Sequence, residues 1–425
     1  MSRAPDAAGP AKWVDRLSRV PTTIMAQAFS FLDARSHSRL ASAARCFRAT
    51  ARLPAASPRF IRMTRHPLRL VRHLRPAALV CKLPDPGDLE IVADMACSLR
   101  ALRVTGMRHL DLQCLSRLTR LDQVDIRAQQ QCDPDDLKFI AHLPLLTRLA
   151  VDATWDERHM LAVGRLCPGL ASLCFGLLMP SATPSATPSA TPGATPGAMS
   201  SVVPPVTPAE FAAAFGNLAA LRCCIRDRRD LPAKLARLVA AIAGLRDLTV
   251  SSFSLLSSFD CYPAGLRRLD LSRNPVDAGQ LALICASVTG LRTLVLADCA
   301  PRDSSPRIDL GPLTALALEE LDLFGCAING TLPFMPRLQT LHLNCDVDAA
   351  LTSLRSRLPN LTRLHVSTGA VAVRYRHADL DLPPSLTGIW TAEPHAFSEL
   401  ALHGIAVQPL PLSLAAFPLP ALACR

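Results

Sequence analysis

The feature that most constrains this chain is one short pattern, L-x-x-L-x-apolar, which returns twelve times in 425 residues. Successive copies start 20 to 27 residues apart, with one interval of 48. The copies start at Leu99, Leu121, Leu146, Leu170, Leu218, Leu245, Leu266, Leu291, Leu318, Leu338, Leu361 and Leu386. A unit of this length predicts a stack of similar layers sharing one core, because each unit alone is too small to bury its apolar side.

Side chains alternate along a strand, so the second and third apolar residues of each copy point to the same side. Segments 232–244 and 278–290 carry apolar residues at helical spacing and end at Gly244 and Gly290. Apolar residues make up 49% of the chain and aromatic residues 4%, which suits many thin layers filled by Leu, Ala and Val. We therefore predict an α/β leucine-rich-repeat solenoid, a horseshoe with parallel strands inside and helices outside.

The 48-residue interval contains the tandem sequence SATPSATPSATPGATPGA, residues 181–198. Proline at every fourth position blocks both helix and sheet, so we expect a disordered, solvated insertion over 177–208. Its Thr-Pro pairs are candidate sites for proline-directed kinases. The alternative is a tandem expansion that a surface loop tolerates at little cost in stability.

Three copies end in a residue that indicates the class of repeat. Asn274 closes LRRLDLSRN, whereas Cys299 closes LRTLVLADC and Cys326 closes LEELDLFGC. Together with CPGL at 167–170, these copies resemble the cysteine-containing leucine-rich repeats. The resemblance implies that cysteine replaces the usual turn asparagine, and proteins with such repeats frequently begin with an F-box.

Residues 19–54, RVPTTIMAQAFSFLDARSHSRLASAARCFRATARLP, resemble an F-box. Pro21 can begin a helix, and apolar residues continue at helical spacing beyond it. The resemblance implies an all-α three-helix F-box-like module over 19–62 that binds a Skp-type adaptor and, through it, a cullin complex. It assigns adaptor binding to Pro21, Ile24, Leu32, Leu40 and Phe47. The alternative is a plain helical cap that seals the first repeat.

The remaining boundaries follow from these assignments. We expect a disordered N-terminus over 1–18, an irregular first repeat or connector over 63–98, repeats over 99–405, and a C-terminal cap or tail over 406–425. In the connector, Ala78–Cys81 is the expected strand and Leu89–Met95 the expected helix.

On the concave side of such a sheet, the residue between the second and third apolar positions points outward. In the C-terminal copies this position supplies acidic, imidazole and indole side chains, with an aromatic residue beside them. We expect a partner-binding concave face made by Asp270, Asp322, Phe324, His342, His365 and Trp390. Two alternatives remain: Trp390 packs under the C-terminal segment, or Asp322, His342 and His365 bind a metal. No supporting pattern accompanies the latter, so we predict no metal site.

The net charge is +11, and residues 1–80 hold fifteen basic and three acidic residues. This basic segment is either a solvated surface or a contact for an acidic partner. Nucleic-acid binding through this segment is the less favoured third hypothesis, and it predicts salt-sensitive binding that is lost when residues 1–80 are deleted. The fifteen cysteines are scattered and odd in number, which predicts free thiols.

No phosphate-binding loop, nucleophile elbow or zinc-protease motif occurs, so we predict no enzyme and no cofactor. The first twenty residues contain no apolar run, and no apolar stretch of about 18 residues exists, so we expect no secretory signal and no membrane span. The resemblances to an F-box and to cysteine-containing repeats imply a substrate-recognition subunit of an SCF-type (cullin-RING) ubiquitin ligase, which we expect in the cytoplasm or the nucleus. The alternative is a repeat scaffold or regulator without a ligase role.

Overall fold

The computed structural model describes the parts of the chain that carry the repeats. They are residues 60–63, 77–82, 90, 92–93, 98–107, 112–128, 134–155, 157–178, 206–225, 231–252, 261–299, 308–328, 331–344, 353–367, 381–391 and 405–409. The chain divides into two compact units, Met1–Ala153 and Thr154–Arg425. Each unit is described by itself below.

In the first unit, consecutive strands pair side by side and parallel, in the order in which they occur in the chain. They are β1 (Phe60–Met63), β2 (Ala78–Lys82), β3 (Ala101–Met107), β4 (Gln123–Ala128) and β5 (Arg148–Trp155). Short 3-10 helices, η3 (Gln113–Arg117) and η4 (Pro134–His142), connect the later strands. A right-handed return through a short helix is what allows neighbouring strands to run parallel.

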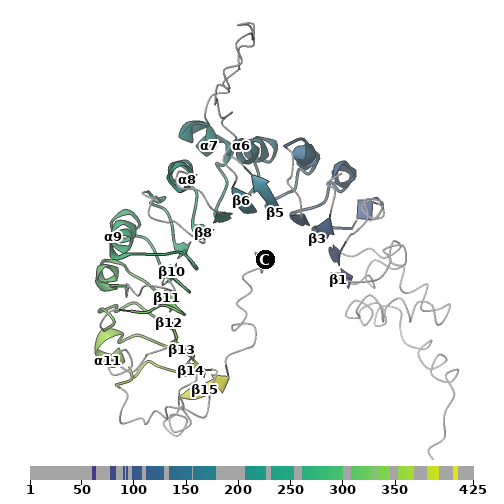
Figure 1. Cartoon of the computed structure of the whole chain (residues 1–425). Helices are drawn as coiled ribbons and strands as arrows, with labels where there is room; N and C mark the ends of the chain where they lie inside the picture. Colours follow the sequence, from purple (N-terminus) through teal and green to yellow (C-terminus); the bar gives the residue numbers. More distant parts are fainter. Residues whose placement is uncertain are drawn as a thin grey trace, which may run out of the picture. The chain divides into compact units, whose positions relative to one another are not determined.

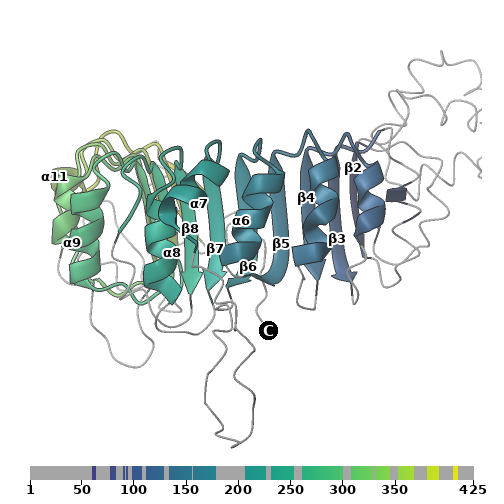
Figure 2. The ribbon, with the colours of Figure 1, turned by 90° about the horizontal axis from the view of Figure 1, so that it is seen from above.

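The second unit repeats this arrangement from β6 to β15, again with parallel pairing of consecutive strands. Its strands are β6 (Ser172–Leu178), β7 (Ala220–Ile225), β8 (Asp247–Ser252), β9 (Arg268–Asp270), β10 (Thr293–Val295), β11 (Glu320–Leu323), β12 (Thr340–Asn344), β13 (Arg363–Ser367), β14 (Gly388–Thr391) and β15 (Ala406–Pro409). Its helices are α6 (Glu157–Leu166), α7 (Pro208–Ala214), α8 (Leu231–Ala240), α9 (Ala278–Ser287), η5 (Gly311–Ala315) and α11 (Leu354–Arg357). The helices lie along one side of the strands (Figure 1, Figure 2).

The repeat pattern predicted the strands correctly. Each of the twelve starting leucines is followed, two residues later, by the first residue of a strand, β3 to β14. The inward side chains are buried as expected, with Leu269, Leu294 and Leu321 all 0% exposed. The two predicted helices are present as α8 and α9.

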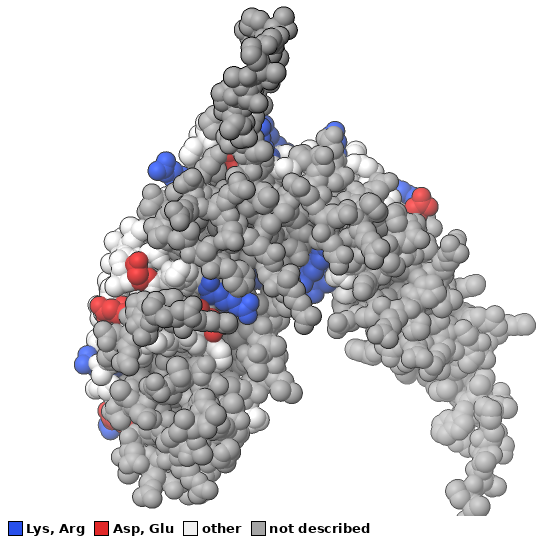
Figure 3. Space-filling model, viewed as in Figure 1, with Lys and Arg blue, Asp and Glu red and all other residues white. Residues whose placement is uncertain are grey.

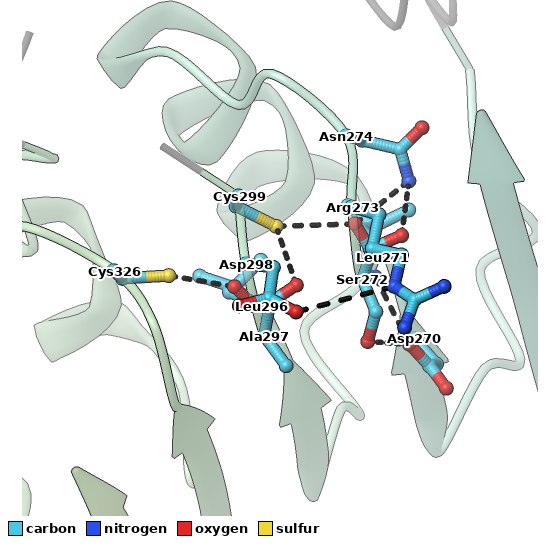
Figure 4. Close-up of polar contacts among 10 residues, drawn as sticks. All are labelled: Asp270, Leu271, Ser272, Arg273, Asn274, Leu296, Ala297, Asp298, Cys299 and Cys326. Atoms are coloured by element: carbon cyan, nitrogen blue, oxygen red, sulfur yellow. Dashed lines mark hydrogen bonds and ion pairs between the residues drawn. The ribbon is translucent and has the colours of Figure 1, made fainter. Parts of the chain in front are cut away.

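The turn after each of three strands is closed by a hydrogen bond to the preceding repeat. Figure 4 shows two of these bonds, those of Cys299 and Cys326. The Asn274 amide donates to the carbonyl of Val250 at 2.7 Å. The Cys299 thiol donates to the carbonyl of Leu271 at 3.1 Å. Cysteine therefore takes the place of asparagine, because each supplies a buried side-chain donor to a backbone carbonyl of the preceding repeat. The fold is a leucine-rich-repeat solenoid.

The residue before each of these turn donors has a left-handed backbone. Its φ is 64° at Arg273, 57° at Asp298 and 73° at Gly325. The backbone N–H groups of the first two donate to the next repeat, Arg273 to Ala297 at 2.7 Å and Asp298 to Phe324 at 2.6 Å. Only the third copy uses glycine, the residue that adopts this conformation without a steric cost.

The structure corrects three of the expected boundaries. The helical module expected over 19–62 overlaps β1, which begins at Phe60 and pairs with β2. The repeats continue beyond 405, because β15 adds a further parallel strand to β14. The insertion expected over 177–208 is shorter at both ends, because β6 extends to Leu178 and Thr207 caps α7. The connector strand is present as β2, and Glu90, Val92 and Ala93 are helical within the expected helix.

The capping of α7 shows why that helix begins where it does. The Thr207 side chain accepts from the Glu210 backbone N–H at 3.2 Å, and the Glu210 carboxylate accepts from the Thr207 N–H at 3.1 Å. This reciprocal pair and Pro208 in the first turn together fix the start of the helix. Within the described residues, no helix is long and apolar enough to span a bilayer.

Candidate protein-binding face

One row of side chains crosses the second unit on the face opposite its leucine core. Strand register places each member directly beside the next. We call it the central row; its members are Thr249, Asp270, Val295, Asp322, His342, His365, Trp390 and Gln408. Five of the six residues expected on the partner-binding face belong to this row, and Phe324 lies two residues beyond Asp322.

Three rings of the central row form a continuous stack. The His342 and His365 rings lie 4.1 Å apart between centroids with an interplanar angle of 7°. The Trp390 ring lies 4.9 Å from that of His365 at 13°. Parallel strands about 4.8 Å apart bring matching positions to ring-stacking distance, so the register itself builds the stack. Beyond it, the Trp390 indole N–H donates to the Gln408 side-chain oxygen at 3.1 Å.

The central row is more buried than the sequence predicts. Asp270 is 7% exposed, Asp322 5%, His342 8% and His365 9%. These four side chains lie on the expected face, but little of their surface reaches solvent. Side chains at matching positions of the adjacent strands lie beside each of them, and the stacked rings cover one another's faces. Trp390 is half-buried and Phe324 is 40% exposed, so these two remain accessible.

Both buried carboxylates hold the chain as it leaves the strand. Asp270 Oδ1 accepts from the Ser272 backbone N–H at 3.0 Å and from its hydroxyl at 2.6 Å. Asp322 Oδ1 accepts from the Phe324 backbone N–H at 2.9 Å. An aspartate that accepts from the N–H two residues later fixes a local turn. Sequence spacing identified the position of these residues on the face but not this structural task.

The electrostatics of the stack follow from its burial. Desolvation lowers the pKa of His342 to about 4, although the Glu320 carboxylate opposes the shift. Desolvation also lowers the pKa of His365 to about 4, and the charges of His342 and Arg363 act in the same direction. Both imidazoles are therefore neutral at pH 7. The floor of this part of the face is a neutral aromatic surface.

Burial has the opposite effect on the neighbouring acid. Desolvation raises the pKa of Asp322 to about 6, because the charged form loses water, and nearby carboxylates add to the shift while the Phe324 N–H opposes it. Its Oδ2 lies 4.0 Å from His342 Nδ1. With a neutral imidazole this contact is not an ion pair at pH 7.

A second row, on the side where the strands begin, carries the charges. Arg268 lies 3.8 Å from the Glu320 carboxylate, and the Thr293 hydroxyl donates to the same carboxylate at 3.3 Å. Arg363 is exposed, and its guanidinium makes no hydrogen bond or ion pair within the described part of the chain. On the side shown in Figure 3, the described basic and acidic side chains are interspersed in small groups.

Gly388 makes room for the indole. A Cβ at this position would lie 2.7 Å from Trp390 Cη2 and 2.9 Å from Cζ3. The ring of Trp390 therefore lies against the Gly388 backbone, two residues earlier on the same face. A glycine two residues before an outward tryptophan was the sequence signal for this packing.

In the first unit the corresponding face carries a smaller charged group. Arg103 on β3 pairs with Asp125 on β4, and Arg127 lies 3.4 Å from the same carboxylate. Exposed pairs of this kind contribute little to stability. The face of the second unit holds the aromatic side chains, as the sequence indicated.

Two further predictions concern adaptor binding and metal binding. Pro21, Ile24, Leu32, Leu40 and Phe47 lie outside the described residues. Among the described residues, no three His, Cys, Asp or Glu side chains are grouped so as to hold a metal ion.

No family model matches the sequence, and no curated protein matches it. An internalin (inlF) from Listeria monocytogenes is 14% identical with a TM-score of 0.41, over 75% of this chain and 81% of that chain. Rad7, from its complex with Elc1 in yeast, is 14% identical with a TM-score of 0.42, and the match covers 89% of this chain and 94% of that chain. A chain of the TLR13-ssRNA13 complex is 13% identical with a TM-score of 0.43, and the match covers 82% of this chain and 52% of that chain. The strand register and turn hydrogen bonds of the chain itself establish the repeat fold.

Proposed function

We propose that this chain is the substrate-recognition subunit of a cullin-RING ubiquitin ligase of the SCF type. Its F-box-like segment binds a Skp-type adaptor, and the face of its second unit binds the target protein. Ubiquitin transfer then belongs to partner subunits, and this chain raises the effective concentration of target lysines near them.

The observation that carries this proposal is the place where the repeats begin. β1 starts at Phe60, directly after the F-box-like segment 19–54. No further domain fits between the two, so an adaptor-binding module and a target-binding solenoid follow each other along the chain. The resemblance of the segment to an F-box and the cysteine-type turns at Cys299 and Cys326 support the same arrangement.

Co-purification tests the proposal. Tagged full-length protein, expressed in cells together with a Skp-type adaptor and a cullin, should retain both through washing. A Leu32→Asp, Leu40→Asp double variant should lose them, because each change places a charge in an apolar contact. A Leu145→Asp variant is the matched control, since Leu145 is 55% exposed in the first unit.

Loss of adaptor from the wild-type protein, under conditions where an ordinary F-box protein retains it, would contradict the ligase role. The chain would then be a repeat scaffold or regulator that binds proteins through the same face. That alternative needs only the repeat fold and the face described above.

A further inference from the structure

We propose that the β11–β14 face binds an extended segment of the target protein that presents a carboxylate to Arg363 and an apolar side chain to Phe324. This inference names the chemistry of the target and rests on the target-binding part of the proposed function. Four observations carry it: a fixed exposed aromatic ring, an unpaired cation, their spacing, and the ring stack that begins between them at His342.

Phe324 is the exposed aromatic residue of this face. Its side chain is 40% exposed, yet its backbone is held on both sides. Its N–H donates to Asp322 Oδ1 at 2.9 Å, and its carbonyl accepts from the Asp298 N–H at 2.6 Å. A ring on a fixed backbone loses little conformational freedom on binding, which is the property of an interface anchor.

Arg363 supplies the charge complementarity. Glu320 on β11 already contacts Arg268 and Thr293. On β12 to β15, Arg363 carries the one formal charge at pH 7 among the outward residues of the central row and the second row. The other outward residues of these two rows are Thr340, His342, His365, Gly388, Trp390, Ala406 and Gln408. An exposed guanidinium with no carboxylate of its own pairs best with a carboxylate from a partner, which it can bind through two N–H groups.

The two residues are separated by four residues along a strand and two strands across, which amounts to roughly 16 Å. An extended peptide of about five residues covers this distance. A partner therefore presents its acidic and apolar side chains about four or five positions apart.

By strand register, His342 on β12 lies midway between them and begins the ring stack that continues through His365 on β13 and Trp390 on β14. This stack is neutral and held by ring contacts on adjacent strands, so it offers a preformed apolar floor. Both faces of the His365 ring are covered by its neighbours in the stack. A nucleobase needs a free ring face on which to stack, and a phosphate backbone needs several cations, so this face favours a peptide over single-stranded nucleic acid.

Selection of phage-displayed random 12-residue peptides on the full-length protein tests this inference. Enriched peptides, synthesised with a fluorescent label, should contain Asp or Glu four or five positions from Phe, Leu or Trp. In anisotropy titrations, Arg363→Glu should weaken their binding at least about tenfold, because repulsion replaces a charge-assisted contact. Phe324→Ser should also weaken it.

Arg357→Glu is the matched control. Arg357 is exposed at the end of α11, in the helical layer rather than on the sheet face, and its substitution should leave the affinity within about twofold. Thermal unfolding of each variant verifies that the fold is retained.

Three results would overturn the inference. They are enrichment no greater than on the Arg363→Glu, Phe324→Ser double variant; affinity unchanged by Arg363→Glu; and displacement of the peptides by a labelled uridine 12-mer that binds more tightly. Adaptor retention is measured separately on the Arg363→Glu variant and should be unchanged. Peptide binding without adaptor retention would contradict the ligase role but support this binding face. Adaptor retention without peptide binding would contradict only this inference.

Discussion

The Cys326 thiol donates a hydrogen bond to the backbone carbonyl of Leu296, one repeat earlier, with an Sγ–O distance of 2.6 Å. Cys326 is 4% exposed, so the carbonyl has little access to water. This contact joins two repeats through their turns as well as through their strands.

Replacing Cys326 by alanine should therefore destabilise the protein by about 0.5–1.5 kcal/mol, the net contribution of one hydrogen bond, because the Leu296 carbonyl keeps the Cys299 backbone N–H as a donor at 3.2 Å. Cys326→Ser should lose less, because its hydroxyl remains a donor. Urea denaturation followed by circular dichroism measures both. Cys285→Ala is the control, since Cys285 is a buried thiol within a helix; an equal effect there would show that only apolar volume matters.

Gly325 should not tolerate a side chain. Its φ is 73°, and an added Cβ would lie 2.2 Å from Asp298 Oδ1. We expect Gly325→Ala to cost about 1–2 kcal/mol through left-handed strain alone. Gly216→Ala is matched to it, because nothing lies within 4 Å of a Cβ built there. Equal melting temperatures for the two variants would contradict the assigned backbone.

Gly388→Ala should displace the Trp390 ring, because the new methyl group would occupy the space of the indole. The expected result is easier quenching of tryptophan fluorescence by acrylamide and a changed near-ultraviolet circular dichroism spectrum. The chain has two other tryptophans, Trp13 and the fully buried Trp155. A Trp390→Phe background gives their combined signal, which is subtracted to obtain that of Trp390. An unchanged spectrum would mean that the ring does not lie against Gly388.

The ring stack predicts acid sensitivity. His342 and His365 have pKa values of about 4, below the ordinary 6.5, so the unfolded chain binds more protons between these values. Their contribution to stability is present above pH 6.5 and is lost as the pH falls toward 4. The raised pKa of Asp322, about 6 against 3.8, acts in the opposite direction over part of this range.

Unfolding free energies measured from pH 7 to pH 4 should therefore decrease, and His365→Phe should flatten the decrease while keeping a ring in the stack. Asp322→Asn should steepen it, because the proton that the folded state gains at Asp322 is no longer available. A decrease that is the same in all three proteins would show that other groups cause it.

The sequence predicted the strands well because each requires only a local pattern. Leu266, Leu269 and Leu271 place β9 and its inward face without any knowledge of distant residues. The cysteine turns were predictable for the same reason, since Cys299 and Cys326 occupy the position of Asn274.

Features that depend on neighbouring repeats were not predicted. The burial of His365 comes from His342 and Trp390, which lie 23 and 25 positions away in sequence. The turn-holding task of Asp322 depends on the direction of its side chain, which alternation does not determine. β1 and β15 lack the full leucine pattern, so strand pairing alone reveals them.

The most direct test of the central claim is calorimetric titration of a purified Skp-type adaptor into the full-length protein. The account predicts one-to-one binding with a dissociation constant in the micromolar range or tighter, about −8 kcal/mol or more favourable. Binding should be lost in the Leu32→Asp, Leu40→Asp variant and unchanged in Arg363→Glu. Absence of heat with the wild-type chain, beside normal binding by an ordinary F-box protein, would contradict it.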